Sequence, residues 1–340
     1  MMNHIGKKLL ERNFLLFITM VLFVVMYVVG LIVFKEKNFG NTQVFFNLFT
    51  SNAGLIIVSV GMTMVLIIGG IDISVGSLVA VTSMMLAAMM EKANMGVAPA
   101  ILIVIIFGLV FGAIQGWLIA YLNIQPFIVT LAGMFFARGL TAVISLEMIT
   151  ITNPAFLAIA QNKIHLPFGG YINKKGMMIY PYIYPTVILA LFIVVITYFM
   201  LKYTKFGRSI YAVGGKEQSA LLMGLDVKRT KLYVYMINGV LATLGGIAFC
   251  LNTTGAFVEL ARGFEMDAIA ATVIGGTPLT GGVGNVFGTL FGVLIKATIE
   301  TFVSFQGNLS SWWSKIIISA LLAFFIVLQS LLVKRKKKIN

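Results

Sequence analysis

The sequence predicts an all-α polytopic membrane protein, with about ten transmembrane helices and two related glycine-rich helix breaks. Of the 340 residues, 59% are hydrophobic and only 11% are charged, and the mean hydropathy is +1.00. A soluble domain of this length cannot bury so much apolar surface. The apolar residues also fall in repeated runs of the length that crosses a bilayer, about 20 residues for a core of about 30 Å. We therefore expect residues 1–340 to form a single transmembrane domain.

The expected spans begin close to the N-terminus. Lys7, Lys8 and Arg12 precede the first apolar run, which ends at Lys35 without a small-residue cleavage site. This run is too long for the apolar part of a signal peptide, so we interpret it as the first membrane helix. Hydropathy then places the spans near residues 14–34, 53–69, 73–90, 97–120, 127–146, 182–201, 232–250, 266–280, 284–304 and 315–333.

Basic residues gather in three segments that an even number of spans places on one side of the membrane. The N-terminal segment, residues 202–231 and residues 334–338 together hold 15 of the 25 lysines and arginines. The positive-inside rule assigns these segments to the cytosol, so both termini are expected there. The net charge of +14 is then loop charge, and we expect no nucleic-acid partner. One cysteine and two histidines exclude a disulfide scaffold and a zinc site, so no metal site is expected.

Two glycine-rich segments interrupt the apolar runs in the same way. Residues 68–76 read IGGIDISVG, and residues 274–282 read IGGTPLTGG. Paired interruptions of this kind in two halves of a transporter indicate broken helices, whose free backbone groups face a cavity. An alternative is a pair of tight turns, with Asp72 or Ser74 capping the helix that begins near Val75. The first interpretation assigns a pathway or gate to Gly69, Gly70, Asp72, Ser74, Gly275, Gly276 and Thr277.

Small and charged residues inside the spans carry further expectations. Glycines recur every fourth residue at positions 108, 112 and 116 and again at 284, 288 and 292, which allows helix backbones to approach closely. Lys296 and Glu300 stand four residues apart, so they either pair with each other or extend toward the membrane surface. Arg138 lies inside an expected span, where an arginine needs a partner or water.

The segment 202–231 forms a strongly basic insert between two apolar runs. Within it, residues 215–224 can form a short helix that carries a small apolar patch, bounded by glycines and flanked by basic residues. Such a patch suits insertion into a cleft on a moving partner, whereas the alternative is a solvated loop. The contact is expected at Gly214, Gly215, Glu217, Ala220, Leu221, Leu222 and Gly224.

Several catalytic motifs are missing from the sequence. Gly215 and Lys216 are followed by Glu217, so the pattern of a phosphate-binding loop is not completed. No Ser-His-Asp arrangement and no HExxH pattern point to a hydrolase. We therefore expect no catalytic residue and no directly bound cofactor, and any ATP would be hydrolysed by a separate subunit. Acidic residues deep in the spans are few, which makes ion coupling the weaker idea.

Four separated segments occur in the order found in one family of membrane proteins. They are IGGIDISVGS at 68–77, PFIVTLAGMFFARG at 126–139, VGGKEQSALLMGLDVKRTK at 213–231 and FEMDAIAATVIGGTPLTGGVGNVFGTLFG at 264–292. These segments resemble the permease subunits of bacterial ribose, xylose and galactoside ATP-binding-cassette (ABC) importers. The stretch GNLSSWWSKI at 307–316 further resembles the galactofuranose branch of that family.

The resemblance implies a permease domain in the bacterial inner membrane, with residues 202–231 as its cytosolic coupling segment. It implies an ABC ATPase subunit, an external sugar-binding protein and a second copy or a homologous permease as partners. A neutral sugar needs hydroxyl and aromatic contacts, so Phe127 and Thr130 join the expected pathway. The expected function is inward transport of a monosaccharide, galactofuranose-like or another pentose or hexose, by alternating access. The alternatives are an ion-coupled secondary sugar transporter and a membrane anchor without transport.

Overall fold

The computed structural model describes the backbone of residues 2–172, 178–310 and 312–339. Side chains are described for residues 15–170, 178–310 and 312–328. The basic clusters expected at the two ends of the chain lie outside these described side chains.

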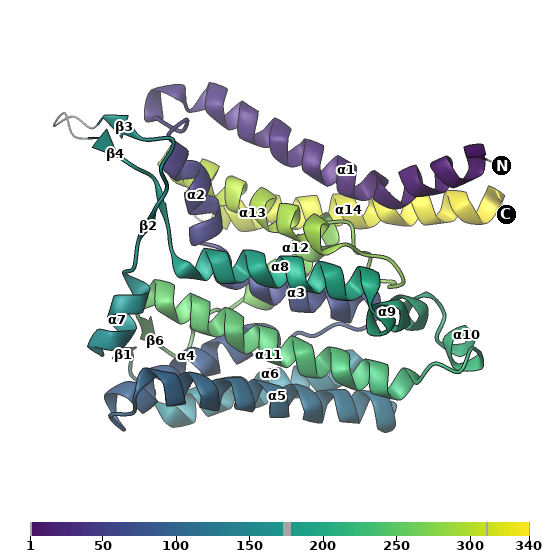
Figure 1. Ribbon diagram of the computed structural model, residues 1–340, viewed down its shortest axis with the longest axis horizontal. Coiled ribbons are helices and arrows are strands. Elements are labelled where there is room, and N and C mark those ends of the chain that lie inside the picture. The colour runs from purple at the N-terminus through teal and green to yellow at the C-terminus, as the bar shows by residue number, and fades with distance from the viewer. Residues whose placement is uncertain (1, 173–177, 311, 340) are drawn as a thin grey trace.

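Helices make up most of the described chain (Figure 1). In chain order they are α1 (Met2–Val33), the 3₁₀ turn η1 (Lys35–Lys37), α2 (Thr42–Thr50), α3 (Ala53–Ile67), α4 (Val75–Glu91), α5 (Val97–Tyr121), α6 (Pro126–Ile144), α7 (Pro154–Ala160), α8 (Pro185–Tyr203), α9 (Lys205–Gly215), α10 (Glu217–Leu222), α11 (Val227–Thr253), α12 (Phe264–Ile274), α13 (Val286–Gln306) and α14 (Trp312–Ile339). Two-residue strands form three antiparallel pairs: β1 (Ile149–Thr150) with β6 (Gly255–Ala256), β2 (Ile164–His165) with β5 (Tyr182–Ile183), and β3 (Tyr171–Ile172) with β4 (Met178–Ile179).

Six helices of the described chain are long and apolar enough to cross a membrane. They belong to α1, α5, α6, α8, α11 and α13, and α2 with α3 makes a seventh span if this pair, bent by 51°, counts as one. Each of the spans expected from hydropathy falls on a helix, but α4 and α12 are short, with 17 and 11 residues. The predicted polytopic helical fold is therefore confirmed, whereas the count of about ten spans stays a prediction.

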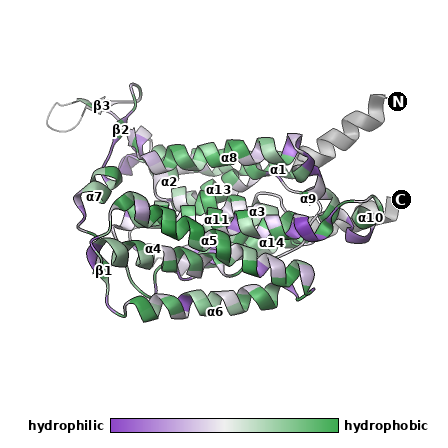
Figure 2. Cartoon of the chain, turned by 60° about the horizontal axis from the view of Figure 1, so that its bottom comes forward, coloured by the Kyte–Doolittle hydropathy of each residue, from purple (hydrophilic) through white to green (hydrophobic). Residues whose placement is uncertain are grey.

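The two ends of the bundle differ in what they carry. The ends of α1 and α14 that hold the chain termini lie at the same end as α9 and α10, and the short strands and α7 lie at the opposite end (Figure 1). Hydrophobic residues cover the helices between them, and hydrophilic residues gather near β1 and near α9 and α10 (Figure 2). This distribution is the one expected for a bundle that crosses an apolar layer of about 30 Å.

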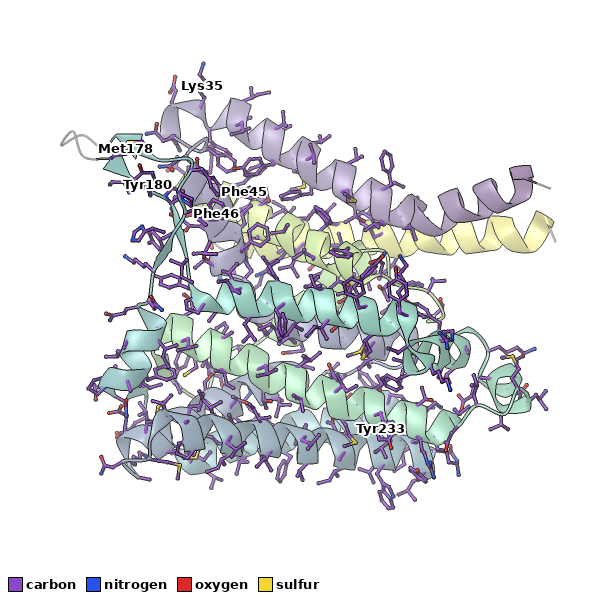
Figure 3. The ribbon with its side chains drawn as sticks, in the orientation of Figure 1. Lys35, Phe45, Phe46, Met178, Tyr180 and Tyr233 are labelled. Carbon is purple, nitrogen blue, oxygen red and sulfur yellow. The ribbon has the colours of Figure 1, made fainter. Side chains whose placement is uncertain are left out.

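The strand-bearing end is held together by polar contacts and aromatic packing. Glu91, the last residue of α4, accepts one hydrogen bond from the backbone N–H of Thr152 at 2.8 Å and another from its hydroxyl at 2.5 Å. The bond from the hydroxyl is the main reason why the pKa of the Glu91 carboxyl lies below its usual value. Phe45 and Phe46 of α2 lie at this end (Figure 3), and the ring of Phe46 lies 6.3 Å from that of Phe168. The described residues between α6 and α8, 145–172 and 178–184, therefore pack against the bundle through Thr152 and Phe168.

Helices α3 and α11 form the centre of the bundle. Every residue of α3 is buried, and α11 packs against α3, α4 and α5. A Cβ atom on Gly108 would lie 2.7 Å from the carbonyl oxygen of Gly239, and one on Gly112 would meet the carbonyl oxygen of Tyr235. Only glycine allows α5 and α11 to come this close, so the predicted packing role of the glycines on α5 is confirmed.

Candidate functional site

The first break, residues 68–74, separates α3 from α4 and is mostly buried, with Gly69 exposed. Gly69 has φ +80°, in the left-handed region that favours glycine. A Cβ atom on Gly70 would meet the hydroxyl of Tyr235. The structure therefore requires glycine at both positions, at Gly69 for the backbone conformation and at Gly70 for the close contact with α11.

A buried carboxylate holds this break to two neighbouring helices. Asp72 is 2% exposed, and its Oδ1 accepts hydrogen bonds from the backbone N–H and the hydroxyl of Ser74 at 2.8 and 2.5 Å. Its Oδ2 accepts from Nδ2 of Asn238 on α11 at 2.7 Å. Nε2 of Gln115 on α5 donates to the Ser74 hydroxyl at 3.0 Å. We call these four residues the Asp72 cluster, and their mutual bonds offset the cost of burying a carboxylate.

The hydrogen bonds of the Asp72 cluster differ from the expected helix cap. Ser74 precedes α4, but its side chain makes no capping bond to the first turn. Asp72 accepts the N–H of Ser74 itself instead of one farther along α4. The capping alternative is therefore wrong for both residues, and their side chains connect the break to α5 and α11.

Three buried residues with polar groups in this region were not predicted from the sequence: Gln115, Tyr235 and Asn238. Gln115 and Asn238 are amides within long apolar runs, a signal that could have identified them because polar side chains inside spans are rare and need partners. The Tyr235 hydroxyl has no hydrogen-bond partner among the described residues and faces Gly70. Nothing in the sequence pattern sets Tyr235 apart from a packing residue.

The second break, residues 275–285, separates α12 from α13 and touches the first. The N–H of Gly282 donates to the carbonyl oxygen of Ile67, the last residue of α3, at 2.8 Å. Gly281 and Gly282 have φ +78° and +80°. Glycine at these two positions lets the second break reach the end of α3, so the structure brings together the two segments that the sequence paired.

The other residues expected in the second break are mostly enclosed. Gly275 is buried, and a Cβ atom on it would lie 2.5 Å from the carbonyl oxygen of Gly288 on α13. Gly276 has φ +95°. Thr277 is fully buried, and its hydroxyl has no hydrogen-bond partner among the described residues. Of these three residues, Thr277 offers an unused hydroxyl close to the junction of the breaks.

The two residues expected in the pathway on α6 lie in different surroundings. The hydroxyl of Thr130 is buried and donates to the carbonyl oxygens of Pro126 at 2.9 Å and of Ile71 at 3.3 Å. Phe127 is 53% exposed on the outside of the chain. The structure therefore joins Thr130 to the first break and separates Phe127 from it.

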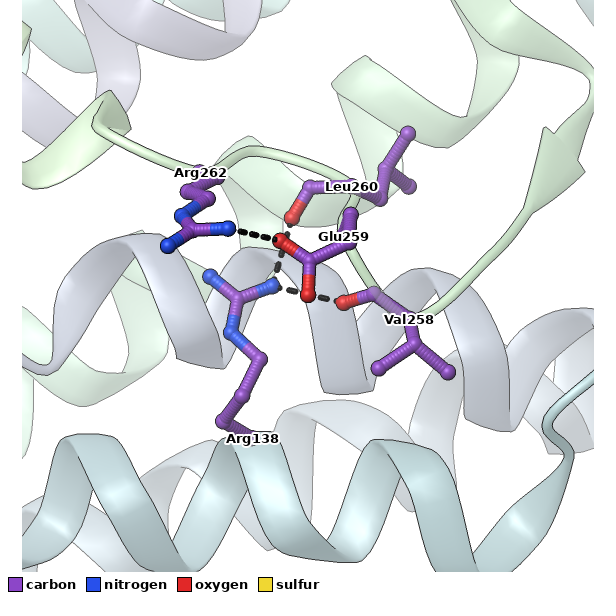
Figure 4. A network of polar contacts seen from close by, with 5 residues as sticks. All are labelled: Arg138, Val258, Glu259, Leu260 and Arg262. Atoms are coloured by element: carbon purple, nitrogen blue, oxygen red, sulfur yellow. Dashed lines mark hydrogen bonds and ion pairs between the residues drawn. The ribbon is translucent and has the colours of Figure 1, made fainter.

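The two charged groups left open by the sequence both have partners. Nη1 of Arg138 donates to the carbonyl oxygens of Val258 and Leu260, both at 2.8 Å, and so fastens α6 to the segment before α12 (Figure 4). Nζ of Lys296 lies 2.7 Å from Oε1 of Glu300, and its side chain is buried. Of the two expectations for Lys296, pairing with Glu300 is therefore the one that the structure shows, and Lys296 does not extend to the surface.

The short helix α10 presents an apolar surface at the end of the bundle. Leu221, Leu222 and Met223 are 63%, 87% and 67% exposed. Glu217 forms an ion pair with Lys231 at 2.8 Å. Ala220 is fully buried, so the apolar patch consists of the three following residues, and Ala220 holds α10 to its own chain.

The glycines around α10 have contrasting surroundings. A Cβ atom on Gly215 or Gly224 would meet nothing within 4 Å, whereas one on Gly214 would meet the carbonyl oxygen of Ile67. Gly214 also lies close to the backbone of Gly282. The end of α9 therefore packs directly on the junction of the two breaks.

Comparison with known proteins identifies the family of this chain. The family model described as "Branched-chain amino acid transport system / permease component" matches residues 44–326. The chain belongs to this family. No solved structure matches the permease.

Three relatives illustrate the similarity, which extends over most of the permease. It is 43% identical over 321 residues to the inner membrane ABC transporter permease protein YjfF of Escherichia coli (strain K12), covering 94% of this chain and 93% of the relative. It is 40% identical over 287 residues to the fructose import permease protein FruG of Bifidobacterium longum (strain NCC 2705), covering 83% and 81%. It is 33% identical over 303 residues to the ribose import permease protein RbsC of E. coli (strain K12), covering 89% of both.

The substitution Asn238→Ala tests the Asp72 cluster. It removes the donor to Oδ2 of Asp72 and leaves a buried carboxylate oxygen unpaired, which costs about 1–3 kcal/mol. We expect a lower midpoint of thermal unfolding in detergent, measured by intrinsic fluorescence. Asn162→Ala, at an exposed position, is the matched control and should leave the midpoint unchanged. Equal midpoints for the two variants would contradict a stabilising role for the cluster.

Proposed function

We propose that this chain is the membrane-spanning permease subunit of an ABC importer that moves a monosaccharide into the cell. Family membership supports the permease role, and the names of the relatives, which include fructose and ribose import permeases, support a sugar substrate. The substrate is a pentose or a hexose. A galactofuranose-like sugar is the first to test, because residues 307–316 resemble the galactofuranose branch of the family.

The proposed orientation places α9, α10 and both termini in the cytosol. Seven lysines and arginines within residues 202–231 support it, because basic residues are concentrated in cytosolic loops. The opposite end, with α7 and the strand pairs, then faces the external sugar-binding protein (Figure 1). The location is the bacterial inner membrane, in line with the name of the E. coli relative YjfF.

The observation that carries the proposal is the position of α10. Its exposed patch of Leu221, Leu222 and Met223 stands at the end of the bundle, and the preceding helix α9 packs on the junction of both breaks. An ATPase subunit that binds this patch can move α9, and α9 transmits the movement to the ends of α3 and α13. Gly215, Glu217 and Gly224 flank the contact and leave it accessible.

Alternating access follows if this movement separates the two breaks. The bond between the N–H of Gly282 and the carbonyl oxygen of Ile67 is a single backbone hydrogen bond, worth about 1 kcal/mol net. ATP binding by the partner supplies enough free energy to exchange it for other contacts. A second permease copy, or a homologous permease, completes the pathway in this proposal. Gly69, Thr130 and the residues of the second break then lie near the moving region.

The Asp72 cluster has a positioning role in this proposal. Its four side chains are buried and hydrogen bonds connect them to one another, so in this proposal they hold helices together and do not contact the sugar. Oδ1 of Asn238 has no hydrogen-bond partner among the described residues. The cluster holds Asp72 and Ser74, at the α4 end of the first break, against α5 and α11 while Gly69 and the second break move. Phe127, which is exposed on the outside of the chain, is a candidate contact for the second permease copy.

An ion-coupled secondary sugar transporter is the less favoured alternative. The relatives are named as an ABC transporter permease and as import permeases. Lys296 pairs with two carboxylates, Glu300 at 2.7 Å and Asp267 at 3.5 Å. The permease binds no cofactor directly in this proposal and is not itself an enzyme, since ATP is hydrolysed on the partner.

Reconstitution tests the function and the α10 contact together. Vesicles that contain the permease, its ATPase and the binding protein should take up labelled monosaccharide only with ATP. Leu222→Asp should abolish co-purification of the ATPase and reduce uptake at least tenfold, because a carboxylate replaces the most exposed apolar side chain of the patch. Leu122→Asp, exposed after the last residue of α5, is the control. Uptake driven by an ion gradient without ATP would refute the proposal.

Neighbouring glycines allow a matched test of transmission from α9. Gly214→Ala places a methyl group against the carbonyl oxygen of Ile67, whereas Gly215→Ala meets nothing within 4 Å. We expect Gly214→Ala to lower ATP-driven uptake at least fivefold while the ATPase still co-purifies, and Gly215→Ala to behave as wild type. A symmetrical size-exclusion peak for both variants shows that folding is intact. Equal uptake by the two variants would contradict the proposed route.

A further inference from the structure

An apolar groove on the side of the bundle is not used by the proposed transport mechanism. It has a volume of about 330 Å³ and lies between α5, α9 and α11. Its walls are Leu109 of α5, Phe206 of α9 and a stripe of α11 that includes Tyr233, Met236, Ile237 and Val240. Such a groove needs an occupant with an apolar surface, which in a membrane is either lipid or protein.

The groove runs along α11. Tyr233, Met236, Ile237 and Val240 are three or four residues apart and therefore share one face of the helix. The eight residues from Tyr233 to Val240 are separated by seven steps of 1.5 Å and therefore span about 10 Å. Tyr233 lies on the part of α11 nearer to α10 (Figure 3), so the groove extends from that end of the bundle toward the middle.

Aromatic rings stand at the end of the groove nearest α10. The ring of Phe206 lies 6.2 Å from that of Tyr233 in an edge-to-face arrangement, and Tyr233 is 48% exposed. Tyrosine with one apolar and one wet side is typical of the level at which lipid headgroups meet the hydrocarbon. The groove therefore opens near the headgroups and extends into the hydrocarbon of the same leaflet.

Exposed basic residues lie close along the chain to the residues at this opening. Lys205 directly precedes Phe206, and Arg229 lies one turn before Tyr233 on the same face of α11. Lys228 is next to Arg229, and its Nζ lies 5.6 Å from the centre of the Tyr121 ring. Among the described residues, Lys205 and Lys228 form no ion pair, while Arg229 pairs with Asp226. The opening thus carries unneutralised positive charge.

We propose that this groove binds an anionic phospholipid, with one acyl chain along α11 and the phosphate beside Lys205, Lys228 and Arg229. The apolar walls match the chain, and the basic collar complements the headgroup, as in other basic pockets between transmembrane helices. The apolar walls alone would also suit a helix of a protein partner, but Lys205 and Lys228 at the opening, which have no ion-pair partner among the described residues, favour an occupant with an anionic headgroup.

Native mass spectrometry of the full-length permease tests this proposal with two probes. The delipidated protein is titrated with dioleoyl phosphatidylglycerol, which is anionic, and with dioleoyl phosphatidylcholine, which is zwitterionic. We expect wild type to bind the first adduct of phosphatidylglycerol at least fivefold more tightly than that of phosphatidylcholine. Equal binding of the two lipids would overturn the proposal.

Three variants locate the site. Lys205→Gln combined with Lys228→Gln should remove the preference for phosphatidylglycerol, and Ile237→Trp, which fills the groove, should weaken the binding of both lipids. The control pair Lys92→Gln with Lys163→Gln changes two exposed lysines nearer the strand-bearing end and should keep the wild-type preference. A preference that survives the first pair, or that the control pair also removes, would overturn the assignment. The assignment would also be overturned if Ile237→Trp changed the oligomeric state and left lipid binding unaltered, because a second copy of the chain would then occupy the groove.

Discussion

A helix that ends inside an apolar bundle leaves carbonyl groups that must find donors, and this constraint shapes the centre of the permease. Helix α3 is buried along its whole length and ends at Ile67, whose side chain is fully buried. The carbonyl oxygen of Ile67 receives the N–H of Gly282 from the second break. An unpaired carbonyl there would cost about 1–3 kcal/mol, so each break stabilises the other.

Small residues make this junction possible and connect it to the surface. Glycine at positions 281 and 282 supplies the left-handed backbone that brings the second break to α3, and glycine at 214 lets α9 approach the same carbonyl group. The polar side chains of the Asp72 cluster hold the other side of the first break to α5 and α11. The junction therefore joins a rigid part of the bundle to a helix pair that carries an exposed apolar patch.

Much of this architecture could be predicted from the sequence, because hydropathy and glycine patterning are local signals. The repeat of IGG at 68–70 and 274–276 marks the two segments that separate α3 from α4 and α12 from α13, and the cluster of leucines after Gly215 lies in the segment that forms α10. The contact between the breaks could not be predicted, since it joins residues more than 200 positions apart. For the same reason Asp72 was interpreted as a cap or a pathway residue, although its partner Asn238 lies on α11. The burial of Ala220 likewise depends on how α10 folds back on its own chain.

Hydrogen exchange at the junction tests the central claim most directly. The amide of Gly282 is bonded to Ile67 in this structure, so the peptide that covers residues 275–285 should exchange slowly in the assembled transporter without nucleotide. We predict that its exchange accelerates during ATP turnover with the ATPase and the binding protein present, while a peptide from α5 stays unchanged. Identical exchange of the 275–285 peptide with and without ATP turnover would contradict the account.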